Sequence, residues 1–126
     1  MRPSLALSIG AVFYILAGLV ILIAPAQLLS ASGWPATPDG MLVTARDSGT
    51  LLIVLGLIDW LVRDVVGAPL RGLLWANILR PAASLVVNGW EFAAGVIPPT
   101  VLVVTVAAFV LDIALIAIFA LAVRRA

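Results

Sequence analysis

Long apolar stretches constrain this chain more than any other feature of its sequence. They run over about residues 5–29, 41–62, 69–90 and 98–123. An α-helix needs about 20 apolar residues to cross the hydrocarbon core of a bilayer. Each stretch meets that length, and turn-forming residues such as Gly33, Pro35, Gly67 and Pro98 lie between the stretches. The sequence therefore predicts an all-α polytopic membrane protein whose residues 1–126 form a single four-transmembrane-helix bundle.

The composition supports the membrane and excludes several classes of function. Hydrophobic residues make up 64% of the chain and charged residues 10%, too few polar side chains to cover a water-soluble fold. Cys and His are both absent, which excludes disulfides, thiolate or imidazole metal sites and histidine acid–base catalysis. We therefore expect no metal and no cofactor. A net charge of +1 without a basic run also argues against nucleic acid as a partner.

The placement of arginine predicts the orientation in the membrane. If the chain crosses four times, five of its seven arginines fall on one side: Arg2, Arg63, Arg71, Arg124 and Arg125. The loops on the opposite side, over about residues 31–40 and 92–97, contain none. Arginine and lysine concentrate in cytoplasmic loops. Both termini are therefore expected in the cytoplasm, with the chain in the plasma membrane of a bacterium.

The third stretch carries polar residues at a helical spacing. They are separated by 3, 4, 4 and 3 positions: Asn77, Arg80, Ser84, Asn88 and Glu91. This period places all five on one face of a helix. Polar groups at membrane depth face a cavity or one another, because exposure to hydrocarbon is costly. We name these five residues the polar face. They are predicted to line a cavity that opens toward the outer side, with a kink at Pro81.

Charged residues on the other helices are predicted to complete this cavity. Arg80 and Asp112 both lie near the middle of their stretches, so they are expected to meet near the midplane. Such a buried pair has a second interpretation, in which it only sets the register of the helices. Near the outer end, Arg46 and Asp47 are expected to meet Asn88 and Glu91. Tyr14 lies at about the middle of the first stretch.

These placements lead to three functional hypotheses. In the first, the cavity binds or converts a small lipophilic substrate by carboxylate and arginine acid–base chemistry such as isomerisation, cyclisation or epoxide opening. Asp47, Arg80 and Asp112 would be catalytic, and the substrate-binding residues would be Arg46, Tyr14, Asn77, Ser84, Asn88 and Glu91. In the second, the protein is a non-catalytic accessory subunit of a larger membrane complex. In the third, it is a small transporter. Besides lipid, we expect a homo-oligomer or a complex with other membrane proteins.

The chain also resembles a known group of proteins. Four short helices, the pair Arg46-Asp47 and the segment Asn88-Gly89-Trp90-Glu91 are similar to features of the small DoxX-like four-helix bacterial membrane proteins. The resemblance extends over the whole chain in hydropathy. It implies the four-helix fold and no particular activity. The composition, rich in Ala, Val, Leu and Arg and free of Lys, is similar to that of proteins from GC-rich bacterial genomes.

Overall fold

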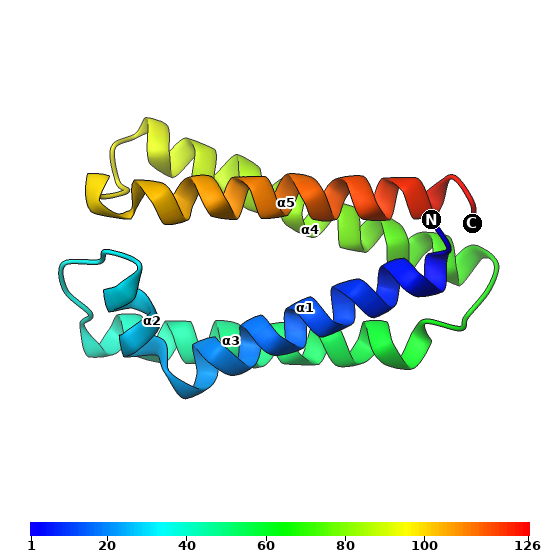
Figure 1. The fold of residues 1–126 in the computed structure, drawn as a ribbon, viewed down its shortest axis with the longest axis horizontal. Helices are drawn as coiled ribbons and strands as arrows, with labels where there is room; N and C mark the ends of the chain where they lie inside the picture. The colour runs from blue at the N-terminus through cyan, green and yellow to red at the C-terminus, as the bar shows by residue number, and fades with distance from the viewer. The chain divides into compact units, whose positions relative to one another are not determined.

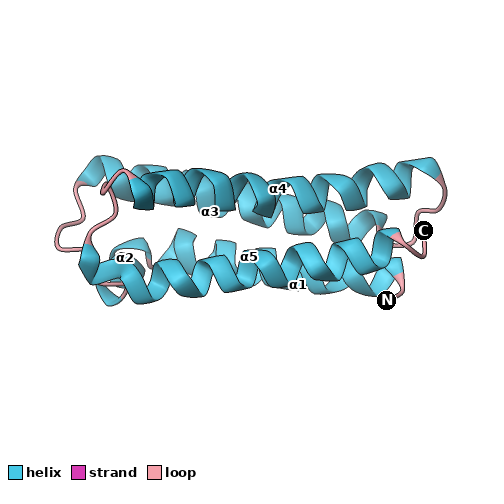
Figure 2. Ribbon diagram, turned by 90° about the horizontal axis from the view of Figure 1, so that it is seen from above, coloured by secondary structure: helices cyan, strands magenta, loops and turns pink.

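The computed structural model describes all 126 residues and consists of helices and loops (Figures 1 and 2). Five α-helices and one short 3-10 helix follow one another along the chain. They are α1 (Pro3–Ile23), α2 (Pro25–Ala31), α3 (Asp39–Val62), α4 (Ala68–Ala93), η1 (Pro99–Val101) and α5 (Leu102–Val123). The predicted all-α class is confirmed.

The first apolar stretch forms two helices where the sequence predicted one over 5–29. Helix α1 ends at Ile23, and α2 begins at Pro25. Ala24 between them has φ −132° and ψ 52°, outside the helical region. The cause is local, because proline lacks an amide donor and its ring disfavours the helical conformation in the residue before it.

Three helical segments are long and apolar enough to cross a membrane. They are Pro3–Ile23, Asp39–Val62 and Pro99–Val123. Helix α4 is 26 residues long, about 39 Å at the usual rise of an α-helix, but Arg71, Arg80 and Glu91 make it more polar than the others. The protein is thus a small multi-span membrane protein, with three apolar spans by length and composition.

The helices belong to two compact units. One unit comprises Met1–Leu7 and Arg63–Ala126, and the other comprises Ser8–Val62. In the second unit, α1 runs along α3 (Figure 1). A methyl group added at Gly18 would lie 2.5 Å from the carbonyl oxygen of Gly49, and one added at Gly56 would lie 2.7 Å from that of Ala11. The two backbones therefore touch at their small residues, as in many membrane helix pairs.

In the first unit, α4 and α5 pack side by side in antiparallel directions (Figure 1). Their buried apolar residues are Leu70, Leu74 and Ile78 on α4 and Leu115, Phe119 and Ala122 on α5. All of these lie toward the end where α4 begins and α5 ends. Toward the other end, past Pro81 and Asp112, the only buried residue on either helix or their connection is Val101. The apolar core of this unit therefore stops near the middle of the two helices.

Candidate functional site

The polar face predicted from the sequence is the less exposed side of α4. Asn77 is buried, and Arg80, Ser84, Asn88 and Glu91 are half-buried. The intervening apolar residues Leu79, Val86 and Val87 are exposed instead. A helix that buries its polar side and exposes its apolar side suits a lipid surrounding. The one-face arrangement expected from the spacing is therefore present.

Two amides of the polar face already have hydrogen-bond partners on α4 itself. The Nδ2 of Asn77 donates to the carbonyl oxygen of Leu73 at 3.2 Å. The Nδ2 of Asn88 donates to the Oγ of Ser84 at 3.0 Å. The helix also continues through Pro81, which is fully buried. Arg80 and Glu91 are then the charged members of a face whose amides are largely held by their own helix.

Asp112 lies near the middle of the adjacent helix α5, as Arg80 lies near the middle of α4. Arg80 is the thirteenth of the 26 residues of α4, and Asp112 is the eleventh of the 22 residues of α5. Asp112 is only 8% exposed. The structure records no hydrogen bond or ion pair for its carboxylate, so the direct Arg80–Asp112 ion pair expected from the sequence is not formed. A contact bridged by water or a ligand stays a prediction.

The remaining predicted site residues lie in the second unit. Tyr14 on α1 is fully buried, and its ring lies edge-on to that of Phe13 with the centroids 5.7 Å apart. Arg46 and Asp47 on α3 are both exposed. The members of the predicted set on α4 and α5 lie in one unit, and their meeting in one site stays a prediction. The participation of Tyr14, Arg46 and Asp47 in the same site stays a prediction.

The most buried carboxylate of the chain had no place in the predicted site. Asp59 on α3 is 2% exposed, less than Asp112. It follows Gly56 by three positions and therefore lies on the helix face that touches α1. The contacts of Gly49 with Gly18 and of Gly56 with Ala11 set the register of the pair, and one further turn places Asp59 opposite Ser8. The signal in the sequence was the seven-residue spacing of Gly49 and Gly56, which marks this face.

Pockets within the two units lie away from the predicted site. Two apolar grooves of about 360 Å³ lie along α1, one beside Leu28 and the other beside Leu57 and Trp60. A hollow of about 400 Å³ lies in the first unit, at the end that carries Arg63 and Arg125. None of the three is lined by a residue of the polar face or by Asp112.

Comparison with known proteins gives no family. No family model matches the chain, and neither a curated protein nor a solved structure matches it. The likeness to the DoxX-like group therefore stays an interpretation of hydropathy and a few residues. The structure shows an all-helical chain with three apolar helices that are long enough to span a membrane.

Proposed function

We propose that α4 is a fourth membrane span and that both termini are cytoplasmic. The length of α4 suffices, and from Asn77 to Glu91 its exposed residues are apolar while its polar groups are half-buried or buried. Reporter fusions test the proposal directly. Fusions at Ala126 and in the loop at Gly67 should report the cytoplasm, and one between Pro35 and Gly40 should report the outside. An external reporter at Ala126 would contradict an even number of spans.

We further propose that the polar face of α4 and Asp112 bind a small lipophilic molecule. The observation that carries this proposal is the burial of Asp112 at mid-helix without an ion pair or hydrogen bond. An ionisable residue inside a membrane is costly, about 2.5–3.5 kcal/mol on insertion scales, and typically marks a functional site. A polar group of a bound molecule, placed between the carboxylate and the polar face, would supply the missing partner.

The distribution of burial favours entry from the end where α4 ends and α5 begins. The apolar core stops near Arg80 and Asp112, and the part of the polar face beyond it is half-buried. A ligand passing Glu91 and Asn88 would reach the carboxylate with its polar end. There, Asp112 would accept a proton from the ligand while the guanidinium of Arg80 stabilises negative charge developing on a ligand oxygen. Isomerisation, cyclisation or epoxide opening of a lipophilic substrate fits these two roles.

Extraction of the purified protein tests for the ligand. The full chain is purified in mild detergent, and organic extracts are compared by mass spectrometry. We expect a small lipophilic compound with the wild type and its loss with Asp112→Asn, a change that keeps the shape and removes one charge. Asp39→Asn is the matched control, because Asp39 is an exposed carboxylate at the start of α3. Retention of the same compound by Asp112→Asn would overturn the proposal.

A second function is favoured by the exposed charges on α3. Arg46 and Asp47 are exposed in a helix that is otherwise apolar enough to cross a membrane. Charged residues at such a position usually meet a polar partner, which is the arrangement expected of an accessory subunit. Copurification in mild detergent separates the two functions. A stable complex that is lost with Arg46→Leu and Asp47→Leu favours the subunit, and Asp47→Asn that abolishes ligand binding in an isolated protein favours the first function.

A further inference from the structure

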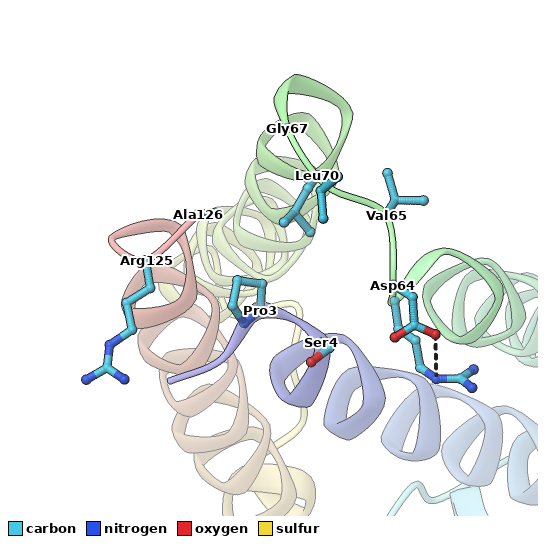
Figure 3. Close-up of a pocket in the computed structure, with 10 residues that line it drawn as sticks. Pro3, Ser4, Asp64, Val65, Gly67, Leu70, Arg125 and Ala126 are labelled. Carbon is cyan, nitrogen blue, oxygen red and sulfur yellow. Dashed lines mark ion pairs between the residues drawn. The ribbon is translucent and has the colours of Figure 1, made fainter.

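The hollow at the arginine-bearing end of the first unit has the chemistry of a phospholipid site. Its volume is about 400 Å³, and both charged and apolar side chains line it. Arg125 and Asp64 lie on opposite sides, with Pro3 and Ser4 between them (Figure 3). We infer that this hollow binds the phosphate headgroup of an anionic phospholipid, with Arg125 as the principal contact.

The charge around the hollow favours an anion. Arg63 and Arg125 both line it, and Asp64 is the one acidic side chain that does. Asp64 is 81% exposed, and its Oδ2 lies 3.7 Å from the Nε of Arg63, a long and solvent-screened pair. Arg125 is exposed, and the structure records no ion pair or side-chain hydrogen bond for it. In Figure 3 its side chain extends outward from the rim of the hollow, so binding requires this flexible side chain to turn toward the headgroup.

The backbone at this end adds to the attraction. Helix α4 begins here with Gly67 as its N-cap, and no side chain caps it. The first amides of an α-helix carry a partial positive charge and favour phosphate groups. Helix α5 ends at the same place and carries the opposite partial charge, which Arg124 and Arg125 offset. The hollow therefore has arginine side chains at its rim and the first backbone amides of α4 beside them.

The apolar residues of the hollow favour a lipid over a free phosphate. Val66, which lines it, is 79% exposed, and Val65 and Leu70 also contribute. An exposed valine beside an arginine is an unfavourable surface in water and a suitable one at a membrane interface, where headgroup and acyl chain meet. Basic pockets at the cytoplasmic ends of membrane helices are known to hold anionic headgroups. The hollow lies at the end that the arginine count assigns to the cytoplasm.

Lipid titration of the full-length chain in nonionic detergent tests this inference. Native mass spectrometry would measure binding of short-chain phosphatidylglycerol, phosphatidylcholine and inorganic phosphate. Phosphatidylglycerol should bind most tightly, and Arg125→Ala should weaken it about tenfold, as expected for one charged hydrogen-bonded contact. Arg124→Ala is the matched control, since it removes the same charge from the neighbouring position, which does not line the hollow.

Each other result overturns the inference in a defined way. Equal losses for Arg124→Ala and Arg125→Ala would mean general attraction to a basic surface. Equal binding of phosphatidylcholine would remove the role of charge. Inorganic phosphate that binds as tightly as phosphatidylglycerol would make this a phosphate site with no preference for lipid. Both substitutions are at the exposed end of the chain, so folding is not at risk.

Discussion

The α1–α3 pair and the α4–α5 pair solve the problem of packing in lipid in different ways. The first brings backbones together at Gly18, Gly49 and Gly56, where even a methyl group would collide. The second uses large side chains such as Leu74 and Phe119 at one end only. Its other half has half-buried polar groups where a core would be. The first pair is therefore built for close contact, and the second keeps half-buried polar groups at mid-helix.

This difference assigns separate roles to the two pairs. Lipid supplies no hydrophobic effect that would drive two helices together. Close approach of two backbones stabilises a helix pair through dispersion contacts instead. No polar side chain lines the groove of about 360 Å³ beside Leu57 and Trp60 at this interface, apart from the indole of Trp60. The α4–α5 pair gives up part of that stabilisation, and it contains Asp112 and Arg80. Stability and ligand binding should therefore respond oppositely to substitutions in the two pairs.

The largest effect is expected at the glycine contact. In Gly49→Val the new Cβ would lie 2.8 Å from the carbonyl oxygen of Gly18 and 2.9 Å from the backbone nitrogen of Leu22. Both are backbone atoms, so the helices must separate. We expect the free energy of unfolding to fall by about 3 kcal/mol, the upper range for overpacking. Thermal unfolding in detergent, followed by circular dichroism, measures it.

Gly72→Val provides the control for this prediction. Gly72 lies in α4 with nothing within 4 Å of its added Cβ, so only helix propensity should change. We expect less than about 1 kcal/mol, in the favourable direction, since valine is a better helix former than glycine. If the two variants have the same stability, backbone contact at Gly49 does not hold the α1–α3 pair together.

Asp112→Leu should change stability in the opposite direction. A buried carboxylate without a partner is destabilising, and replacing it with an apolar side chain of similar size removes that cost. We expect a gain of about 2 kcal/mol, somewhat below the insertion cost of an aspartate, together with loss of any bound ligand. The same unfolding assay and the lipid extraction measure the two effects. A loss of stability would show that Asp112 holds the helices together.

A double-mutant cycle on Arg80 and Asp112 should give a smaller effect. The structure records no direct ion pair between them, so any coupling must run through water or ligand. We expect Arg80→Ala to destabilise more than Arg80→Ala combined with Asp112→Asn, with a coupling energy of about 1 kcal/mol. Additive effects would mean that the two groups act independently and would leave Asp112 without an arginine partner.

The sequence predicted the polar face because its signal is periodic and local. Asn77 through Glu91 repeat at the helical spacing, and burial follows that spacing. The break at Pro25 was also local and was overlooked within a long apolar run. The pairing of α1 with α3 was harder to predict, because α1 is apolar on every side and the charges of α3 do not mark the face that meets it. Only the seven-residue spacings of Ala11 with Gly18 and of Gly49 with Gly56 mark the faces that meet.

The depth of Asp59 could not be predicted for the same reason. Its neighbour Arg63 lies four positions away, and that spacing predicts an ordinary pair at the membrane surface. The structure gives Arg63 an ion pair with Asp64, and it buries Asp59 to 2% exposure. Burial here depends on which face of α3 contacts α1, a tertiary property. Likewise, Arg80 and Asp112 each lie near the middle of an apolar stretch, and this position led to the prediction that they meet. It could not predict that no direct ion pair forms between them.

The smallest effect is expected at Ser84, and it tests whether the polar face contributes to stability at all. The Oγ of Ser84 accepts a hydrogen bond from Asn88, and Ser84→Ala would leave that donor without its partner. Hydrogen bonds between membrane helices contribute about 0.6 kcal/mol on average, and we expect a loss no larger than that for this bond within α4. Ser48→Ala is the control, because the Oγ of Ser48 bonds only to the carbonyl of Thr44 on its own exposed helix surface. Ser84→Ala with Asn88→Val should restore stability, since no buried donor remains. If Ser84→Ala alone costs several times more than predicted, the polar face stabilises the α4–α5 pair, and the division of roles between the two pairs fails.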